Sequence, residues 1–177
     1  MIPSFEKRSK MRRIYADNNA TTRVDDRVVE EMLPLFNETY GNPSSMHTLG
    51  AEAEKKLRQA RERVAEFIKA DPSEIIFAGT GTESDNTALF GTLRAYPDRK
   101  HIITTKVEHP AVLNPCQLLA KEGYAVTFLS VDSEGMLDLD ELRDSITDDT
   151  AIVSVMYANN ETGVICPVEK IGDIVKE

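Results

Sequence analysis

The stretch that decides the fold is HIITTKVEHPAV, at residues 101–112. Its first five residues are rich in β-branched and apolar side chains, as expected of a short buried strand. Pro110 stands where the first position of a helix is expected, because a proline there loses no helical hydrogen bond. We therefore predict a strand over 101–105, a polar turn that contains His109, and a helix over 110–122.

Strands and helices alternate on both sides of this stretch, from residue 74 onward. Short apolar runs predict further strands, and amphipathic segments predict the helices between them. Two more helices, over 27–39 and 48–69, precede this region, and Pro34 interrupts the first. The further strands are expected at 74–78, 124–131 and 151–156, and the further helices at 83–96, 137–146 and from Pro167 onward.

This alternation predicts an α/β fold with three layers, in which helices cover both faces of a mainly parallel sheet. We expect residues 1–12 to be a disordered extension, 13–70 an N-terminal helical segment, and 71–177 the first half of an α/β domain. The last helix meets Glu177 without a capping signal. A sheet of about four strands that stops there is expected to be incomplete, because one edge and one face need more chain.

Composition excludes several classes of function. The 177 residues carry a formal net charge of -9, which is unsuited to gripping a phosphate backbone, so we expect no nucleic-acid partner. No run approaches the ~20 apolar residues of a membrane span, and no apolar segment follows the basic N-terminus as in a signal peptide.

The two cysteines, Cys116 and Cys166, indicate a reducing compartment such as the cytoplasm, and no Cys/His pair has the spacing of a metal site.

Polar residues follow three of the four predicted strands, where ligands bind in open parallel sheets. Residues 79–83, Gly-Thr-Gly-Thr-Glu, lead from the first strand into a helix. Glycines admit a ligand close to the backbone, and the helix start offers N–H groups to a phosphate. The alternative is an ordinary strand-to-helix turn with Thr82 as the N-cap.

His109 follows the second strand and stands at a helix start, where an imidazole could stack on a planar ring and move protons. The alternative for a single histidine is a surface residue near a cap. Asn159 and Asn160 follow the fourth strand, and they serve either as amide donors to a ligand oxygen or as turn residues. A turn that can bind an anion, a stacking group and an amide donor, all at the carboxyl ends of the strands, together indicate a phosphorylated planar cofactor.

Five motifs resemble the cysteine desulfurases, which are similar to class V aminotransferases of fold type I. The resemblance covers the chain from about residue 13 to the end, and it implies that the α/β region is part of a large domain that binds pyridoxal 5'-phosphate. The motifs, in order, are Asp17-Asn18-Asn19-Ala20-Thr21-Thr22, Gly41-Asn42-Pro43-Ser44-Ser45-Met46-His47, Thr82-Glu83-Ser84-Asp85-Asn86, Glu108-His109-Pro110-Ala111-Val112 and Asn159-Asn160-Glu161-Thr162-Gly163.

The resemblance assigns roles to four residues. Gly81 and Thr82 resemble the pair that binds the cofactor phosphate, His109 the histidine that stacks on the pyridine ring and serves as an acid or base, and Asn160 the residue that hydrogen-bonds cofactor or substrate. Residues 80 and 81 depart from the family's usual Gly-Ala.

The family reaction removes sulfur from L-cysteine and gives L-alanine and an enzyme persulfide, whose sulfur goes to iron–sulfur cluster assembly through a scaffold protein. Such an enzyme works as a homodimer. The family's Ser-x-His-Lys motif with its Schiff-base lysine, its persulfide cysteine, its substrate-binding arginine and the aspartate that pairs with the pyridine nitrogen would follow Glu177, so we expect this chain alone to be inactive. Lys106 does not match the lysine motif, and Cys116 and Cys166 are expected to be packed or surface thiols.

Two alternatives remain open at this point. One is a fragment of a related lyase that acts on selenocysteine. The other is a non-catalytic or split-subunit half-protein that pairs with a complementary C-terminal chain or binds the cofactor without turnover.

Overall fold

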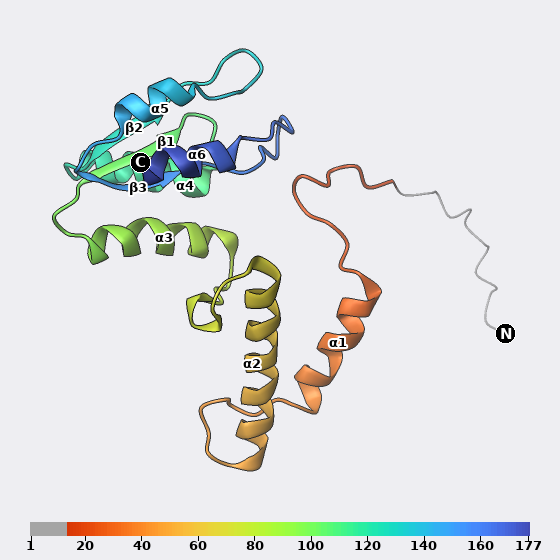
Figure 1. The fold of residues 1–177 in the computed structure, drawn as a ribbon. Coiled ribbons are helices and arrows are strands. Elements are labelled where there is room, and N and C mark those ends of the chain that lie inside the picture. The colour runs from red at the N-terminus through yellow and green to blue at the C-terminus, as the bar shows by residue number, and fades with distance from the viewer. Residues whose placement is uncertain (1–13) are drawn as a thin grey trace. The chain divides into compact units, whose positions relative to one another are not determined.

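The computed structural model describes residues 14–177, so the expected extension over 1–12 lies outside the described residues. The chain divides into two compact units, and the boundary between them in the sequence falls between Ile75 and Ile76 (Figure 1). The first unit is helical, and the second contains the sheet. Among the described residues, no helix is both long enough and apolar enough to cross a membrane.

The first unit consists of two α-helices and one turn of 3₁₀-helix. Helix α1 spans Asp26–Asn37, α2 spans Thr48–Ile68 and η1 spans Pro72–Glu74. The Asp25 side chain caps α1 by accepting from the Arg27 amide, and Pro34 lies inside that helix. Both α-helices agree with the predicted ranges to within two residues at each end.

The loop between α1 and α2 depends on two glycines. A Cβ at Gly41 would lie 2.2 Å from the backbone oxygen of Leu49, and one at Gly50 would lie 2.2 Å from that of Ser45. No side chain fits at such separations without moving the backbone. The loop therefore packs directly on the first turn of α2, which explains the spacing of these glycines in the sequence.

The second unit contains a sheet of three parallel strands in the order β2-β1-β3. The predicted α/β class with a mainly parallel sheet is confirmed. Strand β1 spans His101–Thr105, β2 Ala125–Leu129 and β3 Thr150–Ser154, while the helices are α3 at Gly81–Ala95, α4 at Pro110–Lys121, α5 at Leu139–Ser145 and α6 at Val168–Lys176.

The strand predicted over residues 74–78 is wrong. Its start belongs to η1, which Asp71 and Glu74 hold by a reciprocal capping box, and the residues that follow form no strand. An apolar run becomes a strand only when another strand pairs with its backbone. Among the described residues no strand does so. Ile75 is buried, whereas the Ile76 side chain is 76% exposed.

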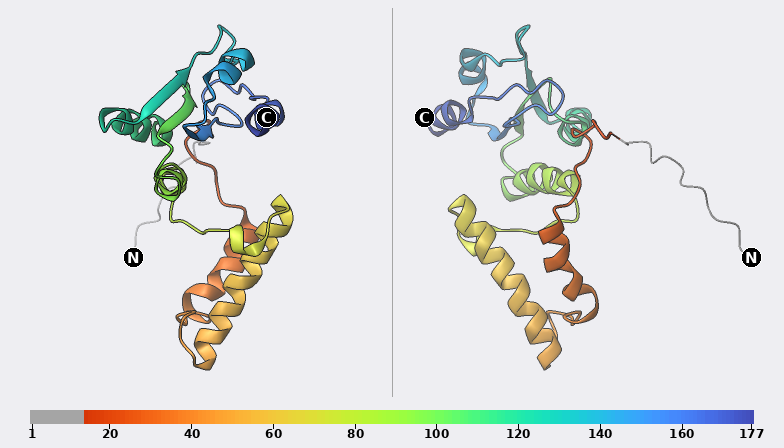
Figure 2. Two further views of the ribbon diagram at one scale, coloured as in Figure 1. Left: turned by 60° about the vertical axis from the view of Figure 1, so that its left-hand side comes forward. Right: turned by 90° about the vertical axis from the view of Figure 1, so that its right-hand side faces the viewer.

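Helices cover both faces of the sheet, as the three-layer prediction requires (Figure 2). Side chains alternate along β1, so Ile102 packs toward α3 and α4 while Ile103 packs toward α5 and α6. The two resulting cores share the central strand. The first contains Leu89, Leu93, Val112, Cys116 and Leu119, and the second contains Leu129, Leu137, Leu142, Cys166, Ile171 and Ile174.

A buried histidine at the start of β1 connects all three strands. The Nδ1 atom of His101 lies 2.9 Å from the Thr150 hydroxyl on β3, and its Nε2 lies 2.9 Å from the Thr127 hydroxyl on β2. Burial lowers the pKa of His101, and the nearby Asp149 carboxylate only partly opposes this effect. His101 is therefore a structural residue, in line with its position at the start of a strand.

Candidate functional site

The carboxyl ends of the three parallel strands meet at one edge of the sheet, where the predicted site residues were expected. His109 follows β1 at the start of α4, and Asn160 follows β3. Thr82 belongs to α3, which packs against α4. A cleft of about 520 Å³ lies between α3 and α4, and both Thr82 and His109 line it.

The start of α3 offers backbone amides to a ligand. Thr80, not Thr82, is the N-cap, because its hydroxyl accepts from the Glu83 amide at 3.1 Å. Helix α3 consequently begins at Gly81, two residues before the predicted start, and Gly81 and Thr82 hold its first two positions, whose amides have no intrahelical acceptor. A Cβ at Gly81 would meet no atom within 4 Å, so the space beside it is open.

An acidic side chain is already engaged at the same turn. The Glu83 carboxylate accepts from the Gly79 amide at 2.8 Å, on the side of the turn that precedes the helix. Gly79 and Thr80 therefore form the hydrogen bonds of the turn, while the backbone amides of Gly81 and Thr82 remain available to a ligand.

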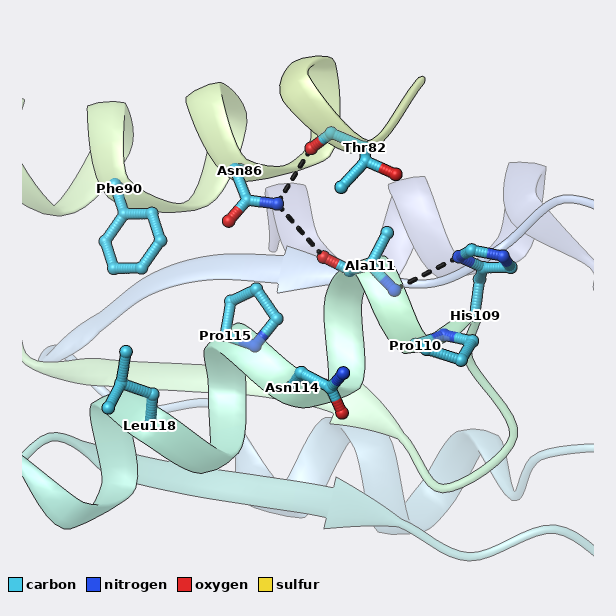
Figure 3. Close-up of a pocket in the computed structure, with 9 residues that line it drawn as sticks. All are labelled: Thr82, Asn86, Phe90, His109, Pro110, Ala111, Asn114, Pro115 and Leu118. Carbon is cyan, nitrogen blue, oxygen red and sulfur yellow. Dashed lines mark hydrogen bonds between the residues drawn. The ribbon is translucent and has the colours of Figure 1, made fainter. Parts of the chain in front are cut away.

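His109 caps α4 with one ring nitrogen and leaves the other outside the helix. Its Nδ1 accepts from the Ala111 amide at 3.1 Å, which leaves Nε2 as the ring nitrogen that can carry a proton toward a ligand (Figure 3). Pro110 takes the first helical position, as predicted. The side chain is exposed, so its ring face is accessible to a ligand. The structure thus shows His109 as the cap of α4, while its role in stacking and proton transfer stays a prediction.

The two asparagines after β3 have different roles. Asn159 builds its own loop, because its Oδ1 accepts from the amides of Glu161 and Thr162 at 2.9 and 3.0 Å. Its Nδ2 also donates to the Val107 carbonyl at 3.0 Å, which joins this loop to the turn that carries His109. Asn160 is exposed, and within the described part of the chain its side chain bonds only to the neighbouring Glu161 carboxylate, at 3.3 Å. Turn chemistry therefore explains Asn159 but leaves the Asn160 amide at the surface.

Glu108 has a structural importance that the sequence did not reveal. Its side chain is only 6% exposed, and its Oε1 accepts from the Thr105 hydroxyl at 3.0 Å and from the Met156 amide at 2.8 Å. Burial raises the pKa of Glu108, although both hydrogen bonds oppose this shift. Its position beside His109 in one motif was the only available signal.

Asn86 is a second residue without a predicted role, and it braces the cleft. Its Nδ2 donates to the Thr82 carbonyl at 2.7 Å and to the Ala111 carbonyl at 3.4 Å, so one amide spans α3 and α4 (Figure 3). The remaining lining residues extend the cleft between the helices. They are Phe90, Pro110, Asn114, Pro115 and Leu118.

Both cysteines are buried, and Lys106 is engaged by a neighbour. Burial raises the pKa of Cys116 to about 11 and also raises that of Cys166. A thiol acts as a nucleophile only as the thiolate, so neither is set up for sulfur transfer. The Lys106 ammonium donates to the Ser130 hydroxyl at 2.9 Å.

Residues 14–177 match the family model described as aminotransferase class V. The chain belongs to the class V aminotransferase family. The chain is similar to proteins named cysteine desulfurases. It is 58% identical over 164 residues to a cysteine desulfurase of Nostoc sp.. It is 52% identical over 165 residues to the cysteine desulfurase NifS of Azotobacter vinelandii. Each alignment covers 93% of this class V chain and 41% of the relative.

Solved structures agree with the family assignment and with the fold. A protein described as NifS-like superposes with a TM-score of 0.90 at 47% identity, over 93% of this chain and 46% of that protein. A structure of SspA in complex with cysteine superposes with a TM-score of 0.86 at 34% identity, over 92% of this chain and 47% of that protein. The chain thus spans less than half the length of these relatives.

Proposed function

We propose that this chain provides the phosphate-binding and ring-stacking side of a pyridoxal 5'-phosphate site in a cysteine desulfurase. The observation that carries the proposal is that Thr82 and His109, at the starts of two different helices, line one cleft. The cysteine desulfurase names of its relatives support the reaction, in which L-cysteine gives L-alanine and a persulfide. In this proposal residues 71–177 are the first half of the cofactor-binding domain and 13–70 the N-terminal helical segment.

The open turn at the start of α3 fits the phosphate of this cofactor. Gly81 and Thr82 offer two backbone amides and one hydroxyl, and the positive end of the α3 dipole favours an anion there. The space beside Gly81 admits phosphate oxygens, because no atom occupies it within 4 Å of a built Cβ. The Glu83 carboxylate already accepts from the Gly79 amide, which keeps it on the preceding side of the turn.

His109 and Asn160 act on the other parts of the ligand. The exposed imidazole of His109 stacks on the pyridine ring and holds or moves a proton at Nε2, while Nδ1 keeps its bond to the Ala111 amide. Asn160 donates its amide to an oxygen of cofactor or substrate. When bound, the cofactor supplies an electron sink for the carbanion of the amino-acid substrate.

The partners in this proposal are L-cysteine as substrate, a second copy or a complementary C-terminal chain to complete the site, and an iron–sulfur scaffold protein as sulfur acceptor. The buried thiols Cys116 and Cys166 suit a reducing compartment, and we assign the protein to the cytoplasm.

The cofactor assignment is tested by titrating the purified chain with pyridoxal 5'-phosphate and following the cofactor's absorbance and fluorescence. We expect saturable binding that weakens about tenfold in Thr82→Val and in His109→Gln, in line with the loss of one charge-assisted hydrogen bond or one stacking contact. Gln117→Ala is the control, because Gln117 is exposed on α4 and does not line the cleft. Equal affinity in all four proteins would contradict the assignment.

The substrate is tested on the protein that carries this chain, loaded with cofactor. Alanine formed from L-cysteine identifies a desulfurase. Alanine formed only from L-selenocysteine would instead identify the related lyase, and binding of the cofactor without either product would identify the non-catalytic half-protein.

A further inference from the structure

We propose that Glu108 is a positioning residue, whose buried carboxylate holds the His109 turn against the segment that leads to Asn160. The hydrogen bonds and burial that carry this inference do not depend on the proposed function. The importance of Glu108 for cofactor binding does rest on the proposed function. Glu108 itself does not line the cleft. It acts through the two chain segments that it joins.

A single carboxylate oxygen of Glu108 joins three parts of the chain. Oε1 accepts from the Thr105 hydroxyl at the end of β1, at 3.0 Å, and from the Met156 amide beyond β3, at 2.8 Å. Met156 is 48 residues away along the chain and four residues before Asn160. The residue next to His109 is therefore fixed directly to the segment that carries Asn160.

A second bond joins the same two segments. The Asn159 side chain donates to the Val107 carbonyl at 3.0 Å, so the turn at 106–109 and the segment at 156–160 are connected at two points. On the other side, the Lys106 amide donates to the Leu129 carbonyl at the end of β2. The His109 turn is thus attached to the ends of both neighbouring strands.

Burying a carboxylate costs free energy, because an ionised group loses its hydration, and hydrogen bonds must compensate for that loss. Packing alone therefore does not explain a buried carboxylate. Among the described residues, none of the titratable groups that interact electrostatically with Glu108 is a cation. Those that interact with Glu108 are the Asp85 carboxylate and the buried thiols Cys116 and Cys166. The acceptor function of the carboxylate, toward a hydroxyl and a backbone amide, is what the structure uses.

The main test compares Glu108→Ala with Glu108→Gln, which keeps an acceptor oxygen. In Glu108→Ala we expect hydrogen exchange of the Met156 amide to accelerate about tenfold or more, since its buried acceptor is lost. We also expect shifted ring nitrogen signals of His109 in NMR spectra and an affinity for pyridoxal 5'-phosphate that falls about tenfold, in proportion to a lost hydrogen bond of about 1.4 kcal/mol. Glu108→Gln should restore all three readouts to within about threefold.

A milder pair of variants decides the matter if Glu108→Ala does not fold. Thr105→Val removes the hydroxyl that donates to Glu108. Thr104→Val is its matched control, because Thr104 is the adjacent residue of the same strand and its buried hydroxyl has no hydrogen-bond partner among residues 14–177. We expect Thr105→Val to move the Met156 exchange rate and the His109 signals, and Thr104→Val to leave both unchanged.

The outcomes separate this inference from the cofactor assignment. If Glu108→Ala lowers only overall stability, while Met156 exchange and His109 signals stay as in the parent protein, Glu108 does not position these segments and the inference is overturned. If both readouts respond but the parent chain binds no pyridoxal 5'-phosphate, Glu108 is a positioning residue and the proposed cofactor is wrong.

Discussion

At the scale of single residues, burial decides which side chains can react. Cys116 and Cys166 are the two thiols of the chain, and both lie in the cores beside the sheet. Their chemistry is therefore set by the helices packed around them and not by the site at the strand ends.

We expect both thiols to react slowly with Ellman's reagent (5,5'-dithiobis(2-nitrobenzoic acid)) in the folded chain. A rise in the pKa of Cys116 from 9.0 to about 11 leaves about a hundredfold less thiolate near neutral pH, and burial blocks access in addition. Labelling followed by mass spectrometry, with and without urea, measures the difference for each cysteine. Rapid labelling of Cys166 in the folded chain would restore it as a candidate sulfur carrier.

His101 is expected to make stability depend on pH. Burial lowers its pKa in the folded state, so the unfolded chain takes up a proton first as the pH falls below about 6.5, and the free energy of unfolding decreases there. Above that value this contribution is constant. Glu108 acts in the opposite sense, because its raised pKa means that protonation relieves a buried charge as the pH falls.

Urea unfolding between pH 5.5 and 7.5, in a Glu108→Gln background, isolates the His101 contribution. His101→Leu should lose the pH dependence and, at pH 7.5, should be less stable by about 1–3 kcal/mol, because the Thr127 and Thr150 hydroxyls each lose their hydrogen bond to the imidazole. An unchanged slope in His101→Leu would show that other groups cause the pH dependence.

At the scale of elements, local signals predicted the helices well. Pro110 fixed the start of α4, and β1 has the predicted ends. The first predicted strand failed because strand formation depends on a partner from elsewhere in the chain, which residues 74–78 do not reveal. The N-cap of α3 was misplaced for a related reason. Thr80 and Thr82 are both acceptable caps, and only the backbone shows that Thr80 accepts from Glu83.

The first turn of α2 should tolerate no side chain at Gly50. A Cβ there would lie 2.2 Å from the Ser45 carbonyl oxygen, so Gly50→Ala must displace backbone and should cost about 3 kcal/mol. Gly91→Ala is the matched control, because Gly91 is also helical and its Cβ would meet no atom within 4 Å. That change should stabilise by about 0.5–1 kcal/mol through helix propensity. Urea unfolding followed by circular dichroism measures both, and equal effects would contradict the packing argument.

At the scale of the whole molecule, the part of the site that could be predicted from the sequence follows from the topology of the sheet. Parallel strands bring their carboxyl ends to one edge, so His109 and Asn160 could be assigned to one region from their order alone. Glu108 and Asn86 could not be found in this way. Their roles depend on partners 48 and 25 residues distant, which become neighbours only in the folded chain.

The division into two units predicts where proteases cut. Residues 76–78 join the units without forming a helix or strand, and Ile76 is largely exposed. Limited proteolysis with chymotrypsin should therefore include a cut after Phe77 among its early products and release a fragment that contains the whole sheet. Mass spectrometry of the early products checks this. A first cut within residues 101–154 would contradict the expected order of local stability.

The position of β1 at the centre of the sheet also affects how the chain folds during synthesis. β1 is the first strand to leave the ribosome, yet it needs a neighbour on each side. β2 can pair with it once residue 129 has emerged, whereas its other edge stays open until β3 is complete at residue 154. An unpaired strand edge invites pairing with other chains. During the interval in which about 25 residues are translated, this edge of the central strand is therefore open to pairing with other chains.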